Sequence, residues 1–415
     1  MDNGTVTIGK NWAGYHEYTA TMLHRPTSLE QLQEIVAAAP RIRALGTRHS
    51  FNDLADSGEL VTLEGLHPDV VIDEESESVS FSAGLRYGDL GVALEAQGWA
   101  LRNLASLPHI SVGGAISTGT HGSGDRNGTL SRAVSGLEFV TADGGLRTVS
   151  PADDAFDGAV VALGALGIVT RVTLDIEPSY QVRQDVYVGL GWSALLDNLD
   201  SITSRACSVS IFTPWTGDTV GAVWMKSRLD ERTPPQELYG IKALTSDMPP
   251  IAGSGESNMT AQGGIPGAWI DRMPHFRMGF TPSNGDELQS EYLIPRQHAV
   301  KALTAIRALA DRLAPHLIIS ELRTMSADSL WLSPAYDRDA LAIHFTWKFE
   351  PEAVLQLLPV IERALEPFDA RPHWGKLFNT LRRDLYPKLP DFVALAEEFD
   401  PEGKFRNAFL EKHVF

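Results

Sequence analysis

The sequence predicts an α+β fold with more than one domain. Its 415 residues suffice for about two to four units of ordinary size. Segments with strand-like alternation and segments with helical periodicity are mixed along the chain, yet few strand–helix–strand alternations of the kind that build a parallel sheet occur. After Pro178 a different mixture of strands, helices and loops begins, which predicts a domain boundary there.

The first elements carry local signals. Ser28 and Gln31 form a capping-box pattern before apolar residues at helical spacing, which predicts a helix. Alternating residues over 41–45 and 79–83 predict two strands, and residues 89–97 predict a second helix.

The stretch from residue 104 to residue 124 is rich in glycine in its second half, so its backbone can approach a ligand closely or adopt positive φ. Asp143 and Gly144 then predict a hairpin turn between two strands. Another alternating strand follows and ends at Pro178, the predicted boundary.

The second part mixes both kinds of element. Helices are expected over 297–313 and 352–365, and strands over 317–324 and 341–347. The final stretch, 391–415, is expected to hold a short helix. This mixture is typical of the α+β class.

Composition argues against several functions. Lys and Arg total 35 against 53 Asp and Glu, and the formal net charge of -18 disfavours nucleic-acid and membrane partners. Cys207 is the only cysteine, so no intrachain disulfide or cysteine zinc cluster forms, and no metal site is predicted. The chain shows neither a signal-peptide pattern nor an apolar run that spans a bilayer. We therefore expect a cytoplasmic monomer.

Two segments have the composition of a ligand site. Consecutive N–H groups in the glycine-rich stretch can cradle a diphosphate, although tight structural turns have the same composition. Neither the Rossmann nor the P-loop glycine motif occurs, so those cofactor sites are not predicted. His49 lies in a glycine turn directly after a predicted strand, although a lone histidine is more often an ordinary polar side chain.

Together the segments resemble the vanillyl-alcohol-oxidase type of flavoproteins and, within it, the alditol (xylitol) oxidases. In family order the matching motifs are NWAGYHEYTA, RPTSLEQLQEIV, GTRHSFND, LASLPHISVGGAISTGTHGSG, LGALGIVTRVTL, ELQSEYLIPR, ELRT, WLSPAY, HFTW, RPHWGK and DPEGKFRNAF. The resemblance implies a two-part FAD-binding domain with an inserted mixed α/β substrate (cap) domain. It implies FAD binding by 11–178, substrate binding by 179–370, and a segment, 371–415, that returns to the FAD domain and active site.

The resemblance also implies a covalently bound FAD. His49 matches the family histidine that bonds to the flavin, and Ala105 matches a position that shapes the path of oxygen. The positions that match cofactor-binding residues of the family are Gly46, Thr47, Arg48, Ser50, Ala105, Ser106, Ser111, Gly113, Gly114, Thr118, Gly119, Gly122, Ile168, Val169 and His373.

Arg48 departs from the family pattern, which often has glycine at this position of the turn. Arginine is strained there if the backbone needs positive φ. Alternatively, its guanidinium pairs with a diphosphate oxygen.

Four polar residues stand on predicted strands. Glu321 and Arg323 are two residues apart and share a strand face. A surface ion pair is the commoner reason for this spacing, but the apolar residues before Glu321 predict a buried strand, where unpaired charges are costly. Such a pair suits the hydroxyls of a polyol. His344 and Thr346 also share a face, either that of a half-exposed strand or that of the site.

Lys376 matches the active-site lysine of alditol oxidases, although an isolated lysine is ordinarily a solvated charge. His373 matches a residue that touches the flavin, and Ser106 matches one that binds the substrate in front of the flavin ring. The implied substrate-binding residues are Ser106, Glu321, Arg323, Thr346 and Lys376.

We therefore expect an FAD-dependent alditol oxidase that converts the terminal primary alcohol of a polyol such as xylitol or sorbitol to the aldose and reduces O2 to H2O2. Lys376 or His344 assists loss of the hydroxyl proton, and the lysine charge alternatively stabilises an alkoxide. An aldonolactone oxidase or dehydrogenase is the alternative enzyme, and an oxygen-insensitive dehydrogenase is related to it. A non-catalytic flavin- or sugar-binding protein is the alternative from another class.

Overall fold

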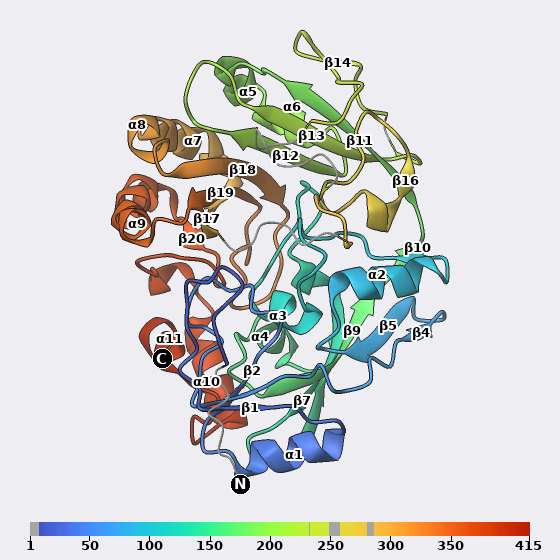
Figure 1. Ribbon diagram of the computed structural model, residues 1–415, viewed down its shortest axis with the longest axis vertical. Coiled ribbons are helices and arrows are strands. Elements are labelled where there is room, and N and C mark those ends of the chain that lie inside the picture. Colours follow the sequence, from blue (N-terminus) through green and yellow to red (C-terminus); the bar gives the residue numbers. More distant parts are fainter. Residues whose placement is uncertain (1–7, 232, 249–257, 280–285) are drawn as a thin grey trace.

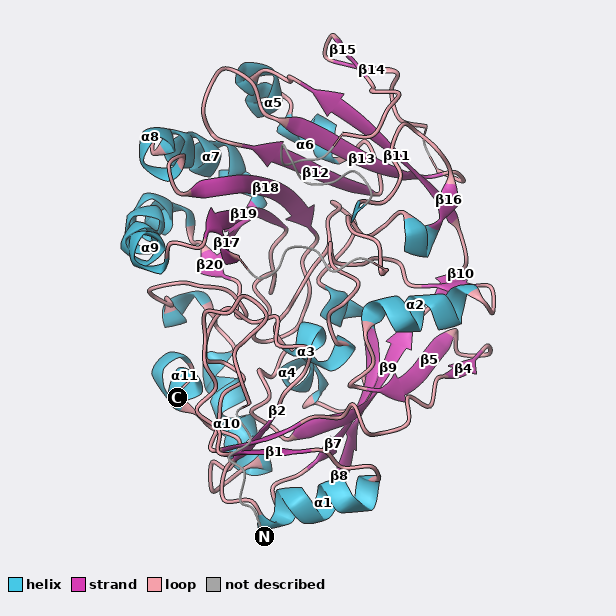
Figure 2. Ribbon diagram, viewed as in Figure 1, coloured by secondary structure: helices cyan, strands magenta, loops and turns pink. Residues whose placement is uncertain are grey.

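The computed structural model describes residues 8–231, 233–248, 258–279 and 286–415. Figure 1 shows an upper half drawn in green, yellow and orange, from the middle of the sequence, and a lower half built from the N-terminal part, coloured from blue through teal to green, and from the red C-terminal part. Neighbouring strands in both large sheets are antiparallel, and helices pack on the sheets (Figure 2). The predicted α+β class is therefore confirmed.

The lower half contains two sheets and the helices beside them. The strand order is β4-β5-β9-β7-β8 in the five-stranded sheet and β1-β3-β2 in the parallel three-stranded sheet. The elements of this half are β1 (Met22–His24), α1 (Leu29–Ala38), β2 (Ile42–Ala44), β3 (Glu59–Val61), β4 (Val71–Asp73), β5 (Ser78–Ser82), α2 (Tyr87–Glu95), β6 (Trp99–Ala100), α3 (Val112–Ser117), β7 (Val134–Val140), β8 (Leu146–Val149), α4 (Phe156–Val160), β9 (Ile168–Asp175), β10 (Glu177–Pro178), α10 (Leu389–Phe399) and α11 (Ala408–His413).

The upper half is built on one eight-stranded sheet in the order β16-β11-β13-β12-β18-β19-β17-β20. Its elements are β11 (Gln181–Val188), α5 (Trp192–Asp197), α6 (Leu199–Thr203), β12 (Ser208–Thr213), β13 (Ala222–Arg228), β14 (Glu237–Leu238), β15 (Ile241–Lys242), β16 (Gly267–Ala268), β17 (Glu287–Pro295), α7 (Ala299–Arg307), α8 (Ala310–Leu313), β18 (Leu317–Met325), β19 (Ala340–Lys348), α9 (Pro351–Leu365) and β20 (Arg371–Pro372). Apolar residues of α5, α6, α7 and α9 form a continuous core with one face of this sheet, so that face is closed to solvent.

Several predicted elements are found with small changes of boundary. Ser28 caps α1, because its Oγ accepts from Gln31 N at 3.2 Å, while Gln31 Oε1 accepts from Thr27 N at 2.8 Å. The Asp143-Gly144 turn joins β7 and β8 in the predicted hairpin.

Two predictions of continuous structure differ from the fold. The helix expected over 297–313 is divided into a 3-10 turn, α7 and α8, because Leu309 N bonds back to Ile306 O at 2.9 Å and so ends the α-helical ladder. The glycine-rich stretch contains the short helix α3, which was not predicted. Its glycines weaken the helical pattern from which a helix would be predicted.

The C-terminal segment joins the two halves. β20 pairs with β17, and the next residues contact the turn after β2, where Phe51 N donates to Gly375 O at 2.8 Å. Asn52 Nδ2 donates to Trp374 O at 2.8 Å and to Lys376 O at 2.9 Å. Lys376 is therefore held between the N-terminal turn and the upper sheet.

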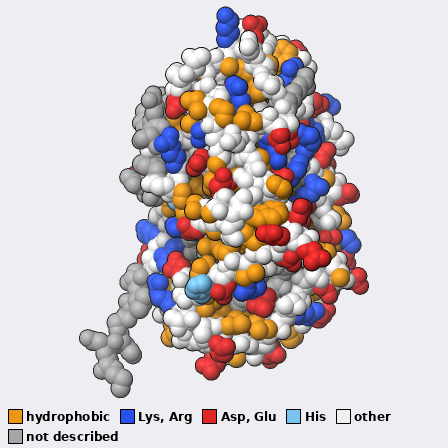
Figure 3. Space-filling model, turned by 90° about the vertical axis from the view of Figure 1, so that its right-hand side faces the viewer, with side chains coloured by type: hydrophobic (Ala, Val, Ile, Leu, Met, Phe, Trp, Pro, Cys, Tyr) orange, Lys and Arg blue, Asp and Glu red, His pale blue; other side chains and the backbone are white. Residues whose placement is uncertain are grey.

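On the face drawn in Figure 3, acidic side chains stand among basic and apolar ones. Within the described ranges, no helix has both the length and the apolar character required to cross a membrane.

Candidate active site

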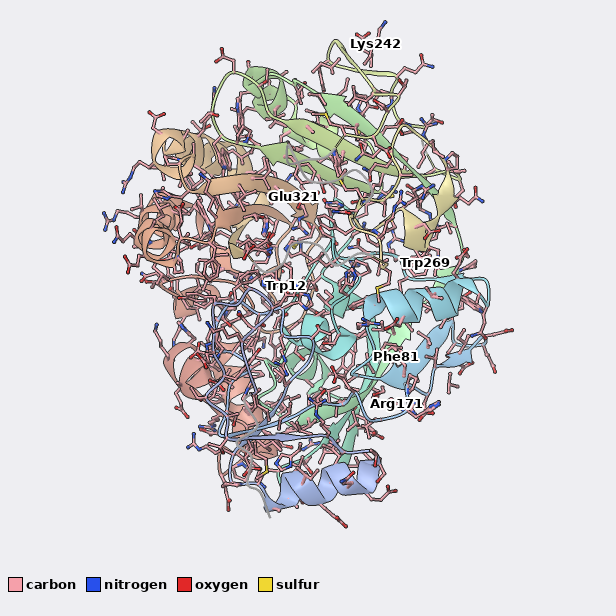
Figure 4. All side chains as sticks on the ribbon, in the orientation of Figure 1. Trp12, Phe81, Arg171, Lys242, Trp269 and Glu321 are labelled. Carbon is pink, nitrogen blue, oxygen red and sulfur yellow. The ribbon has the colours of Figure 1, made fainter. Side chains whose placement is uncertain are left out.

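A cavity of about 640 Å³ lies between the two halves and receives side chains from both. Figure 4 places Trp12, from the N-terminal part, and Glu321, from β18, near the middle of the molecule, and both residues line this cavity. Its two ends differ in chemistry. One is formed by backbone turns and small residues of the lower half, and the other by charged side chains on the upper sheet.

The turn after β2 presents unpaired backbone donors. Among the described residues, the backbone N–H groups of Thr47 to Ser50 have no protein acceptor, although three of these four residues line the cavity. The turn packs against the start of α3, since Ser111 N donates to Thr47 Oγ1 at 3.0 Å and a Cβ on Gly46 would lie 2.4 Å from Ser111 Oγ. Successive unpaired N–H groups of this kind suit an anionic group such as a diphosphate.

Arg48 takes the left-handed conformation within this turn, with φ 62°. Its Nη1 donates to Ile8 O at 2.5 Å, and its guanidinium lies 5.8 Å from the centre of the Tyr18 ring. The side chain does not line the cavity. The positive φ that would favour glycine is therefore present, and in this position the Arg48 side chain is turned away from the cavity, so its pairing with a diphosphate stays a prediction.

His49 is held on two sides at the cavity wall. Its ring stacks on that of Trp12 with centroids 5.3 Å apart, and its Nδ1 lies 3.0 Å from Thr47 Oγ1. Burial, assisted by the neighbouring His109, lowers the pKa of His49 to about 4. The imidazole is therefore neutral at physiological pH, the state in which a ring nitrogen can act as a nucleophile.

The upper sheet aligns three polar side chains in one row. The register of β18, β19 and β17 sets Glu321 opposite His344 and His344 opposite Glu291. Arg323, two residues after Glu321 on the same face, brings its Nε to 3.2 Å from Glu321 Oε1 and its Nη2 to 3.9 Å from Glu291 Oε1. Thr346 Oγ1 lies 3.1 Å from His344 Nε2.

Lys376 reaches this row from the C-terminal segment. Its Nζ donates to Glu291 Oε2 at 2.7 Å and to His344 Nδ1 at 2.8 Å. Burial lowers the pKa of Lys376, and Glu291 only partly opposes the effect. Burial alone would raise the pKa of Glu291, but Lys376, His121 and Arg323 hold it well below its usual range.

Three other groups of the site, His344, His373 and Glu321, have lowered pKa values. Burial and then Lys376 lower the pKa of His344 to about 4, and the same two causes hold that of His373 well below its usual range. Burial would raise the pKa of Glu321, yet Arg323 and His275 keep it low. Glu321 is thus ionised and both histidines are neutral.

Most of the predicted site residues line the cavity. Those that do are Gly46, Thr47, His49, Ser50, Ala105, Ser106, Ser111, Gly113, Gly114, Thr118, Val169, Glu321, Arg323, His344, Thr346, His373 and Lys376. The cavity brings these positions, hundreds of residues apart in the chain, into one lining.

Four predicted cofactor-binding residues lie outside the lining. Arg48 points away from the cavity, as described above. A Cβ at Gly122 would lie 2.3 Å from Leu104 O, and one at Gly119, which has a φ of +63°, would lie 2.8 Å from Pro334 Cδ. Ile168 is buried in the hydrophobic core. Packing and backbone conformation therefore account for Gly119, Gly122 and Ile168.

Glu291 was not among the predicted site residues, although the motif ELQSEYLIPR contains it. Gln289 and Glu291 are separated by the polar Ser290, so the segment shows no clean alternation that would mark Glu291 as a buried residue. Glu291 stands out as a candidate site residue only once β17 is known to be buried in the sheet. There its side chain is 1% exposed, and an unpaired carboxylate would be costly.

Comparisons with known proteins agree with this arrangement. Residues 20–150 match the FAD binding domain family, and residues 284–413 match the D-arabinono-1,4-lactone oxidase family. An alditol oxidase from Streptomyces sp. is 45% identical over 97% of this chain and 98% of its own. The L-gulono-1,4-lactone dehydrogenase of Mycobacterium tuberculosis is 28% identical over 98% of both chains, and the L-gulonolactone oxidase of Bos taurus is 26% identical over 97% of both.

Among solved structures, the cholesterol oxidase of Brevibacterium sterolicum superposes with a TM-score of 0.79 over 98% of this chain and 96% of that one. Its sequence identity is 15%, so this similarity concerns the fold alone. The match to an alditol oxidase, by contrast, has 45% sequence identity along nearly the whole chain. Together with the FAD binding domain match, it places this chain in the alditol oxidase family of FAD-dependent oxidoreductases.

Proposed function

We propose that this protein oxidises the terminal primary alcohol of an acyclic polyol to the aldose and passes the electrons to O2, with release of H2O2. The observation that carries the proposal is the contact of Lys376 Nζ with Glu291 and His344, beside Glu321 and Arg323, in the cavity that also contains the N–H turn. The 45% identity to an alditol oxidase supports the same substrate class.

FAD is the cofactor of this family, and the residues present fit it. The unpaired N–H groups of Thr47 to Ser50 would receive the diphosphate, and Val169 and Ala83 would provide an apolar wall. The neutral ring of His49, fixed by Trp12, would form the covalent bond to the flavin. When bound, FAD supplies the acceptor for the hydride of the alcohol carbon.

Lys376 is the proton acceptor in this proposal. Nζ is tetrahedral, with one bond to its own carbon and three other directions for N–H bonds or a lone pair. Two of these directions are taken by the contacts to Glu291 Oε2 and His344 Nδ1. In the neutral amine, which burial favours, the third direction holds a lone pair that accepts the hydroxyl proton of the substrate. Glu291 then stabilises the resulting ammonium.

His344 is less suited to this role, because its nitrogens are already engaged. Nδ1 accepts from Lys376, so the neutral ring carries its proton on Nε2, which faces Thr346 Oγ1 at 3.1 Å. We assign His344 to positioning Lys376 and Thr346.

Ser106, Glu321, Arg323 and Thr346 bind the polyol hydroxyls in the proposal. The carboxylate accepts from hydroxyl groups, while the guanidinium donates to another, so the chain is held with its terminal carbon forward. Ala105 lines the cavity beside Ser106 and remains the proposed position that shapes oxygen access.

An aldonolactone oxidase or dehydrogenase is the second candidate, because the D-arabinono-1,4-lactone oxidase match over residues 284–413 includes Glu291, Glu321 and Lys376. The test adds xylitol or a γ-lactone to purified protein without oxygen and follows the visible flavin band. Bleaching by xylitol but not by the lactone, with H2O2 formed on admission of air, supports the proposal. Bleaching by the lactone alone overturns it.

Three further assignments belong to the same proposal. Residues 11–178 bind FAD, residues 179–370 bind the substrate, and residues 371–415 return to the active site. The acidic surface favours a monomer. A single cysteine, Cys207, suits the reducing cytoplasm as the place of action.

A further inference from the structure

A chain of buried polar groups lies behind Glu321, on its side away from Lys376. Lys226, on β13, donates from Nζ to Met273 O at 2.6 Å, to Pro274 O at 2.9 Å and to His275 Nδ1 at 3.0 Å. His275 Nε2 in turn lies 2.8 Å from Glu321 Oε1. Lys226 is 1% exposed and is closed to bulk water, whereas His275, 7% exposed, lines the cavity.

These contacts define where the protons are. The three N–H groups of an ammonium ion can satisfy two carbonyl oxygens and an imidazole nitrogen at once, so these contacts favour the charged form of Lys226, whereas burial lowers its pKa to about 7. Because His275 Nδ1 accepts from Lys226, the neutral ring carries its proton on Nε2 and donates it to Glu321. Arg323 Nε lies 3.2 Å from the same oxygen, Oε1. Among the described residues, Glu321 Oε2 has no protein partner.

The packing around His275 prevents the ring from turning. Its ring lies 5.8 Å from that of Phe212 and 5.1 Å from that of Trp224, and Ser210 Oγ is 3.4 Å from Nε2. Its backbone N–H donates to Ser106 O at 3.0 Å. One residue is therefore attached to both Ser106 and Glu321, which come from different halves of the molecule.

We propose that Lys226 and His275 are positioning residues that set the affinity for polyols, by holding Glu321 ionised with Oε2 free for a substrate hydroxyl and by fixing its distance from Ser106. This inference rests on the proposed function, since it concerns the binding of the same substrate. Neither residue touches the reacting carbon. Loss of the hydrogen bonds from Lys226 to His275 and from His275 to Glu321 therefore weakens substrate binding more than it slows the chemical step.

The test compares two variant pairs in the holoenzyme. Lys226→Met removes the donor to His275, and Thr260→Val is its matched control, because Thr260 Oγ1 also bonds to Pro274 O, at 2.8 Å, but does not touch the His275 ring. His275→Leu removes the donor to Glu321, whereas His275→Gln retains an N–H donor there.

We expect K226M and H275L to raise the KM for xylitol roughly tenfold or more, with kcat changed far less, because each removes a hydrogen bond that holds a charged group. T260V and H275Q should stay near the parent enzyme. Equal KM values for xylitol in K226M and the parent would overturn the positioning role, and so would an equal rise of KM in K226M and T260V. If K226M fails to fold, the comparison of H275L with H275Q decides the same question.

A second readout requires no substrate. Nitrogen NMR of histidine-labelled holoenzyme, with H275Q used to assign the signal, should report the proton of His275 on Nε2 in the parent and in T260V. A parent enzyme with the proton on Nδ1 would contradict the proposal. Failure of the parent to oxidise xylitol would instead overturn the proposed function, and the NMR result distinguishes the two.

Discussion

Replacement of Glu291 by Gln tests the proton acceptor most directly. The change removes a buried negative charge 2.7 Å from Lys376 Nζ but keeps an amide oxygen able to accept the same hydrogen bond. Two unit charges at that distance attract by about 6 kcal/mol at an effective dielectric constant of 20. The amide dipole that remains, and the loss of the same carboxylate as a partner of Arg323 and His121, reduce the net effect. We therefore expect the ammonium form of Lys376 to be destabilised by roughly 1.4–2.8 kcal/mol, which lowers the pKa of Lys376 by about one to two units.

The sign follows from what Glu291 does to Lys376. The carboxylate favours the ammonium, so its removal lowers the pKa of Lys376 further below the ordinary lysine value. If the neutral amine takes the proton, activity is lost as the pH falls through this pKa. The acidic limb of the pH profile should therefore move to lower pH in E291Q, while the plateau rate falls roughly 3- to 10-fold because the base is weaker.

The assay is the rate of flavin reduction by xylitol in an anaerobic stopped-flow instrument, measured over the stable pH range. Asp328→Asn is the control, because Asp328 is a partly buried carboxylate that bonds to Thr129 and Ser333 and does not contact Lys376. An acidic limb that stays in place in E291Q, or moves to higher pH, would refute Lys376 as the base. If the acidic limb moves by the same amount in D328N, the shift in E291Q comes from the change in net charge and not from the contact with Lys376.

Three other substitutions test separate parts of the site. His49→Ala should leave FAD that washes out of acid-precipitated protein, and colour that stays in the pellet would disprove the linkage. Lys376→Met should slow anaerobic flavin reduction roughly 10²- to 10⁴-fold, the usual contribution of a general base, with a smaller change in xylitol binding; near-normal reduction would remove Lys376 from the mechanism. Glu321→Ala should raise the KM for xylitol roughly 10- to 100-fold, as expected for a lost charged hydrogen bond, and leave simple alcohols, if they are used, little changed.

Elements with strong local signals could be predicted from the sequence. The capping box at Ser28 predicts the start of α1, and apolar periodicity predicts α9 to within one residue of its observed start. β18 and β19 were likewise expected within one residue at each end. In each case the information lies in neighbouring residues, which is why one sequence suffices.

The parts that could not be predicted depend on contacts between distant segments. Glu291 belongs to the site because β17 pairs with β19, and no pattern within β17 reveals that register. The same holds for His275, whose role depends on Lys226 and Glu321, each about 50 residues away. The direction of the Arg48 side chain depends on Ile8 and could not be inferred from the turn itself.

The charges around Lys376 bear on its proposed role as a base in a buried site. Glu291 and Glu321 are two carboxylates, and Arg323 and Lys226 are two basic groups that belong to the same network. Arg323 offsets part of this negative charge whatever the state of Lys376, so Lys376 is not the sole counter-charge of Glu291. A lysine that faced Glu291 alone would be held permanently as an ammonium ion. Glu291 is shared with Arg323 and His121, and burial lowers the pKa of Lys376, as the proposed role of a proton acceptor requires.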